Sequence, residues 1–236
     1  MLKILKLEGL NFDNFTPAHF PQSLRYLSLR QNNLKSEEST IGVPPKPMLT
    51  VFPVDHRHKI NCLEGVNLIS IDLSSNMLEH FPMHNLYKMS SLRHINLSRN
   101  NIDEFDLGNG NSFLKLQTLD LSANRLKEFP NCYVKQKRLK KLRLIRNHIM
   151  DIPEAFFLSE AAKSLEELSI NSNPLKILNP CINYMTELET LGIAFTEMVE
   201  LPPTIRTMTK LKNLNVAGNK LREPHQIICE RGISAI

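Results

Sequence analysis

Leu116-Gln-Thr-Leu-Asp-Leu-Ser-Ala-Asn-Arg-Leu126 reads L-x-x-L-x-L-x-x-N-x-L, with leucine at the first, fourth, sixth and eleventh places and asparagine at the ninth. The pattern recurs in register along most of the chain, at a spacing of about 23 residues. Self-similarity at such a period predicts a solenoid, in which stacked repeats bury their leucines against one another. An atypical first copy begins at Leu2, and clear copies begin at Leu24, Leu68, Leu92, Leu116, Leu139, Leu165, Leu188 and Leu211.

Strand alternation gives each place of a repeat a direction. Side chains at the first, fourth and sixth places point into the core, and those at the third and fifth places point outward. The ninth-place asparagine sits where the chain turns inward, so its amide can satisfy backbone groups that burial would leave unpaired. We therefore predict that Asn100 and Asn124 are buried and bonded to the backbone. Two copies depart from the pattern, with Leu10 and Thr196 at this place.

The repeat pattern is lost over residues 35–66, which are rich in proline. Proline cannot donate to a strand ladder, so this segment is either a degenerate repeat with Leu49 and Val51 in its strand or a long excursion. The segment from Pro153 to Lys163 predicts one short helix, and residues 222–236 are expected to form a C-terminal capping segment. We expect residues 1–236 to form a single domain.

Composition and cysteine usage favour a globular protein of a reducing compartment. The chain is 42% hydrophobic with a net charge of +5, and it has neither a secretory leader pattern nor an apolar run that could span a bilayer. Its four cysteines are not clustered. Cys132 and Cys181 stand at equivalent places two repeats apart, and a strand spacing of about 4.8 Å puts them too far apart for a disulfide. Free thiols and no membrane insertion are therefore expected.

The whole chain resembles the leucine-rich-repeat superfamily, in the intracellular branch whose repeats read L-x-x-L-x-L-x-x-N-x-L-x-x-L-P. Phe81-Pro82, Phe129-Pro130, Ile152-Pro153 and Leu201-Pro202 match the final part of that motif. The branch includes animal signalling scaffolds and bacterial effectors that act inside host cells. The resemblance implies an α/β fold: a right-handed horseshoe with a parallel concave sheet and short helical or irregular convex segments. It also implies a cytoplasmic location, or the host-cell cytosol for an effector.

No motif predicts an enzyme. The sequence has no glycine-rich phosphate loop and no nucleophile elbow, and no cysteine is followed two places on by aspartate, as in the ubiquitin-ligase domains of some bacterial leucine-rich-repeat effectors. Asp55, His56, His58 and Cys62 offer metal ligands at a spacing that matches no strong zinc signature, so a polar loop is the preferred interpretation. We expect no catalytic residues, no cofactor and no metal.

A basic cluster over residues 135–146 allows two interpretations. It is either a site for an anionic partner, such as nucleic acid or a phosphoinositide, or a solvated face of the repeats. Nucleic acid is disfavoured, because only Tyr133 supplies an aromatic ring near the cluster. Strand register predicts that Arg143 pairs with Asp120 of the preceding repeat, which leaves Lys140, Lys141 and Arg146 free.

The outward places of the sheet predict where a protein partner binds. Most are polar, but Tyr26, Ile145 and Phe195 are large groups at places that the pattern sends to solvent. Aromatic and arginine side chains dominate protein-binding hot spots. We therefore predict a monomeric, non-enzymatic module that binds a partner protein; an anion- or nucleic-acid-binding module, or the recognition part of a longer enzyme, is the alternative. The predicted contacts are Tyr26, Arg30, His94, Arg99, Lys141, Arg143, Ile145, Arg146 and Phe195.

Overall fold

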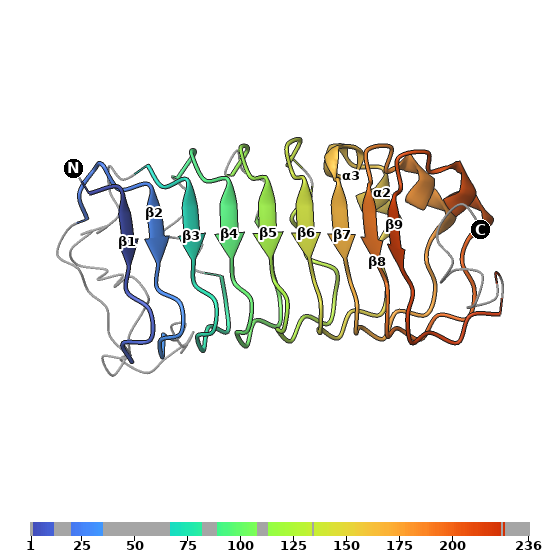
Figure 1. Ribbon diagram of the computed structural model, residues 1–236, viewed down its shortest axis with the longest axis horizontal. Helices are drawn as coiled ribbons and strands as arrows, with labels where there is room; N and C mark the ends of the chain where they lie inside the picture. The colour runs from blue at the N-terminus through green and yellow to red at the C-terminus, as the bar shows by residue number, and fades with distance from the viewer. Residues whose placement is uncertain are drawn as a thin grey trace, which may run out of the picture.

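The computed structural model describes residues 2–11, 20–34, 67–81, 89–107, 113–133, 135–222 and 224. Within these residues, nine short parallel strands form one sheet in chain order, and Figure 1 shows them side by side from the N-terminal to the C-terminal end. The predicted leucine-rich-repeat solenoid is confirmed. The strands are β1 Ile4–Lys6, β2 Tyr26–Ser28, β3 Ser70–Asp72, β4 His94–Asn96, β5 Thr118–Asp120, β6 Lys141–Arg143, β7 Glu167–Ser169, β8 Thr190–Gly192 and β9 Asn213–Asn215.

Each strand occupies the third, fourth and fifth places of its repeat and pairs with the same places of its neighbours. Thr118 lies beside Lys141 and Leu119 beside Leu142, without any slip in register. The fourth-place side chain of β5 is fully buried, and its two neighbours are half-buried. Because a register slip of one residue would send every leucine to solvent, burial of this face fixes the stacking.

Strand β2 pairs directly with β3, with Tyr26 beside Ser70, although their repeats begin at Leu24 and Leu68. The two repeats are also hydrogen-bonded to each other beyond the strands, where Met77 N–H donates to Leu34 O at 2.9 Å. Strands β2 and β3 are therefore direct neighbours in the described sheet. The choice between a degenerate repeat and a long excursion concerns residues that the structure does not describe. Residues 35–66 themselves lie outside the described residues, as does most of the predicted capping segment 222–236.

The ninth-place asparagines form a hydrogen-bonded ladder through the core, as predicted. Asn124 Nδ2 donates to Leu121 O at 2.9 Å and to Leu97 O of the preceding repeat at 3.0 Å. Its Oδ1 accepts from Ile102 N–H at 3.0 Å. One amide thus satisfies three buried backbone groups and joins two repeats. The same arrangement recurs at Asn76, Asn100, Asn147 and Asn173.

The two repeats without this asparagine adjust in the same way. In each, the ninth residue's own N–H donates to the asparagine Oδ1 of the next repeat, from Leu10 to Asn32 at 3.1 Å and from Thr196 to Asn219 at 2.7 Å. In the regular repeats the eleventh residue makes that bond, as Leu126 does to Asn147. The ladder therefore continues through the atypical repeats, with the N–H of the ninth residue donating in place of the N–H of the eleventh.

The segments that return from one strand to the next are helical in the C-terminal half (Figure 1). They are α2 Glu154–Phe157, α3 Glu160–Ser164 and the 3-10 helices η1 Pro180–Tyr184 and η2 Pro203–Thr207. The sequence predicted one helix where α2 and α3 lie, and this was wrong. Ser159 interrupts it, because its Oγ accepts from Ala162 N–H at 3.2 Å and caps a new helix. Cys132 and Cys181 are both free.

Candidate binding surface along the sheet

The eighth place of every repeat has a left-handed backbone. The φ angle lies between 53° and 58° at Gln31, Ser75, Arg99, Ala123, Arg146, Ser172 and Phe195, and glycine takes the place in the first and last repeats, at Gly9 and Gly218. This conformation is uncommon for residues other than glycine, and for bulky residues it is a rare outlier. Sequence reasoning missed this feature, although the two glycines in register were a signal for it.

Phe195 combines this backbone strain with exposure. Its φ is 53°, and 65% of its surface is open to solvent. The ring lies over the glycine of the next repeat, since a Cβ atom at Gly218 would be 2.3 Å from Phe195 Cδ1. The chain therefore holds a large apolar ring in a strained, exposed position that burial in its own core does not explain. We regard Phe195 as the strongest candidate contact on this side of the molecule.

The predicted contacts lie on alternate strands, in the repeats of β2, β4, β6 and β8, and we divide them into an N-terminal and a C-terminal group. Tyr26 and Arg30 belong to the repeat of β2, and His94 and Arg99 to that of β4. The second group lies around β6 to β8, where Arg146, Ser172 and Phe195 occupy successive eighth places. Tyr26 and Phe195 are exposed as predicted, with Tyr26 at 43%, whereas Ile145 is half-buried. The remaining members of the second group are Lys141 and Arg143.

Arg143 pairs with Glu167 of the following repeat, and the predicted pair with Asp120 was wrong. Arg143 Nε lies 2.7 Å from Glu167 Oε1, and Nη2 lies 3.2 Å from Oε2. Asp120 instead turns back on its own chain, where its Oδ1 accepts from Ser122 N–H at 2.9 Å. The hydrogen bond to Arg143 lowers the pKa of Glu167 below its ordinary value and raises that of Arg143.

More cations of the basic cluster form ion pairs than the sequence predicted. Lys140 pairs with Glu166, and Lys141 Nζ lies 3.5 Å from Glu167 Oε2. Arg146 alone of the three cations expected to be free has no ion pair within the described residues. Glu166 and Glu167 of the next repeat therefore offset part of the positive charge that an anionic partner would meet at β6.

His94 is half-buried on the outward face of β4. Its Nδ1 lies 3.2 Å from Thr118 Oγ1 of the next strand. Burial lowers the pKa of His94 below its ordinary value, and the neighbouring charge of Arg93 lowers it further. The imidazole is therefore a neutral polar contact at physiological pH.

The described residues hold neither a metal-binding cluster nor a membrane-spanning helix. No group of three or more histidine, cysteine, aspartate or glutamate side chains in them could hold a metal ion. Asp55, His56, His58 and Cys62 lie outside the described residues. None of the helices that the structure describes is long and apolar enough to cross a bilayer.

Comparisons with known proteins agree with the fold. The family described as Leucine rich repeat matches residues 66–126. The leucine-rich-repeat protein LIC12759 of Leptospira interrogans is 25% identical, with a TM-score of 0.65 over 85% of this chain and 44% of that one. This chain therefore spans less than half of that protein's length. No curated protein sequence matches the chain significantly.

Two further structures share the fold at lower identity. TLR13, solved as a complex with ssRNA13, is 21% identical, with a TM-score of 0.63 over 83% of this chain and 26% of that one. The ectodomain of the plant membrane receptor kinase GASSHO1/SCHENGEN3 from Arabidopsis thaliana, solved with CASPARIAN STRIP INTEGRITY FACTOR 2, is 18% identical. Its TM-score is 0.57 over 93% of this chain and 30% of that one.

Proposed function

Because the chain is a leucine-rich-repeat protein, we propose that it is a non-enzymatic module that binds a partner protein along its sheet. The observation that carries the proposal is Phe195, a strained and exposed ring laid over Gly218. The left-handed backbone is common to the eighth places of the repeats, and the large, exposed apolar side chain is what distinguishes Phe195 among them. An aromatic ring also offers a large buried area to a partner at a low cost in side-chain entropy.

The contact surface that we propose is centred on β6 to β8. Phe195 supplies an apolar anchor, and Arg146 supplies an exposed cation two repeats away, about 10 Å along the sheet. Small Ser172 lies between them and leaves room for a partner side chain. Lys141, Arg143 and Ile145 complete this surface, whereas Tyr26, Arg30, His94 and Arg99 form a separate contact nearer the N-terminal end. We propose further that the chain acts as a monomeric single domain in a cytoplasm.

The role of a bacterial effector in a host cell rests on the family resemblance alone. The alternative of an anion-binding site at residues 135–146 is weakened, because Lys140, Lys141 and Arg143 are all paired with glutamates. TLR13 was solved in complex with ssRNA13, so nucleic acid is a ligand of another protein with this fold. Among the described residues of 135–146, however, no exposed aromatic ring lies beside the paired cations.

Site-specific photocrosslinking tests the surface, because it captures whichever protein lies against a chosen residue. A photoreactive phenylalanine analogue replaces Phe195 in one variant and Ile177 in a matched control. Ile177 is as exposed as Phe195, at 68%, but lies beyond the sheet in the returning segment. We expect a discrete crosslinked protein from position 195 only. Phe195→Ala should then weaken binding of that protein by about thirtyfold, as for an ordinary hot spot, and Ile177→Ala should not. Equal labelling from both positions would place the interface elsewhere.

A further inference from the structure

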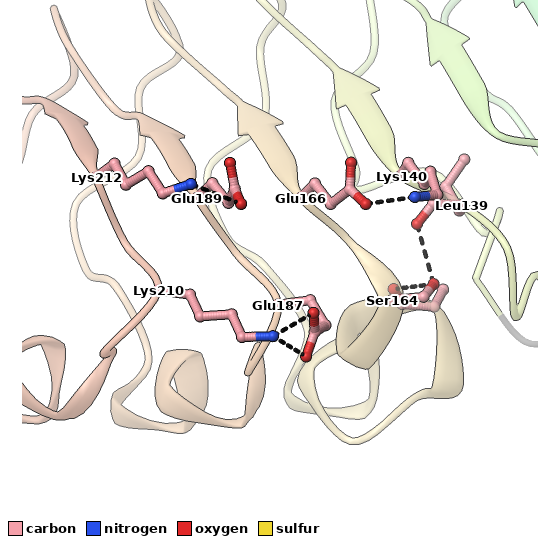
Figure 2. A network of polar contacts seen from close by, with 9 residues as sticks. Leu139, Lys140, Ser164, Glu166, Glu187, Glu189, Lys210 and Lys212 are labelled. Carbon is pink, nitrogen blue, oxygen red and sulfur yellow. Dashed lines mark hydrogen bonds and ion pairs between the residues drawn. The ribbon is translucent and has the colours of Figure 1, made fainter.

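Two columns of side chains cross the sheet just before the start of its strands. One column is the second place of each repeat, and the other is the residue just before its first leucine. We call them the edge columns. In the C-terminal half these edge columns are charged and mutually paired (Figure 2). Lys140 pairs with Glu166, Lys210 with Glu187 at 2.6 Å, and Lys212 with Glu189 at 2.9 Å. Arg138 is the one cation of these columns there without an ion pair in the part of the chain that the structure describes.

The same columns in the N-terminal half carry cations without acids. Lys3, Arg25, Arg93 and Lys115 occupy them, and the other described places hold Ser23, Asn67, Ile69, Ser91 and Gln117. None of the four cations forms an ion pair with any described residue. The repeats that are otherwise equivalent therefore differ in whether their edge charges are neutralised.

Three of these cations line one pocket. It has a volume of about 260 Å³, and the described residues of its wall are Arg25, Asn67, Ile69, Ser91, Arg93 and Lys115, none of which is a carboxylate. The Arg25 guanidinium is held in place, because its Nη1 donates to Gln22 O and Leu24 O at 2.8 Å each. The wall thus combines three positive charges with a hydroxyl and an amide, all of which can donate to an oxyanion.

We propose that this pocket binds a phosphoryl group. Arginine presents a planar fork of donors that matches phosphate geometry, and lysine adds a compact charge. Three cations suit a dianionic phosphoryl group better than a monoanionic carboxylate. The pocket is smaller than the roughly 300–1,000 Å³ of sites for drug-sized ligands, so it takes a single group and not a large molecule. That group comes either from a free phosphate or from a phosphorylated side chain of a partner protein.

The test is an NMR titration of the full chain with phosphoserine at low ionic strength, because exposed charges are strongly screened by salt. Saturable shifts of the Ser91, Arg93 and Lys115 amides are expected. The double variant Arg93→Gln/Lys115→Gln should weaken binding by about tenfold, since each exposed charge contributes a few-fold. The matched control is Lys210→Gln/Lys212→Gln, which removes two charges from the same column places. An equal loss in both variants would reduce the effect to net charge and overturn the pocket.

Four further ligands distinguish the two sources of the phosphoryl group and test nucleic acid as the rival class of partner. Inorganic phosphate and a phosphoserine peptide are compared with the unphosphorylated peptide. A peptide that binds more tightly than free phosphoserine assigns the group to a partner protein, and equal affinities assign it to a small phosphate. Binding of the unphosphorylated peptide with unchanged affinity would contradict the proposal. So would a single-stranded oligonucleotide that binds more tightly than phosphoserine and equally well to both variants. Phe195→Ala should leave all of these affinities unchanged, so the two proposals fail independently.

Discussion

The ninth-place asparagine is the residue on which each repeat depends. Asn124 is buried, and its amide bonds to Leu97, Leu121 and Ile102 in two repeats. Asn124→Ala leaves these backbone groups unpaired, so we expect the free energy of unfolding to fall by about 1–3 kcal/mol. Urea denaturation measures this loss. Ala123→Ser, at the half-buried neighbouring place that is serine in two other repeats, is the control and should change little. An unchanged midpoint for Asn124→Ala would contradict the ladder as a source of stability.

At the scale of elements, the ion pair of Arg143 with Glu167 joins β6 to β7 and makes their contact depend on pH. The pKa of Glu167 is lowered in the folded state, so its stabilising contribution is present above the ordinary value near 4.5 and is lost as the pH falls through the lowered value. Glu167→Gln should therefore destabilise the protein at pH 7 by about 0.5–1 kcal/mol and have little effect in more acidic solution.

A double-mutant cycle with Arg143→Gln isolates this pair from other effects of the substitutions. The coupling should be present at pH 7 and absent once Glu167 is protonated. The parallel cycle of Arg143→Gln with Asp120→Asn should show a smaller coupling, because Asp120 bonds to Ser122 N–H. A larger coupling to Asp120 than to Glu167 would mean that the pair predicted from register forms in solution.

The sequence predicted the elements where the repeat pattern constrains the backbone. The strand around Leu119 and the burial of Asn124 follow from leucine and asparagine spacing alone, because only one register buries both. The partner of Arg143 did not follow, since Asp120 and Glu167 both lie one strand away and local hydrogen bonds decide between them. The break before α3 depended on the capping preference of Ser159, which the periodicity of the repeats does not report.

The candidate site was predictable only in part. The exposure of Tyr26 and Phe195 followed from their places in the repeat, but the left-handed backbone at Phe195 and its contact with Gly218 required the structure. The edge pocket had no sequence signal, because Arg25, Arg93 and Lys115 are far apart in the chain and meet only through strand stacking. Charge clustering in sequence pointed instead to residues 135–146, where two glutamates of the next repeat pair with Lys140, Lys141 and Arg143.

At the scale of the whole molecule, the stability of each repeat depends on its contacts with the neighbouring repeats. Each repeat buries its leucines against its neighbours, so the solenoid behaves as a sum of repeat and interface energies. Leu119 is fully buried in the central strand β5, and Leu119→Ala should cost about 2–5 kcal/mol. Leu5→Ala is the matched control, because Leu5 holds the same place in the terminal strand β1 and is only half-buried. Its cost should be smaller.

Amide hydrogen exchange measures how many repeats are destabilised by such a substitution. Leu119→Ala should accelerate exchange most in β4, β5 and β6, and least in β1 and β9, because coupling runs through nearest neighbours. A uniform acceleration would mean that the nine described strands open as one cooperative unit. Local opening has a consequence for binding, since Phe195 lies in the repeat of β8 and the edge pocket spans the repeats of β2 to β5. Leu119→Ala should then weaken phosphoserine binding at the pocket while leaving crosslinking through position 195 nearly intact.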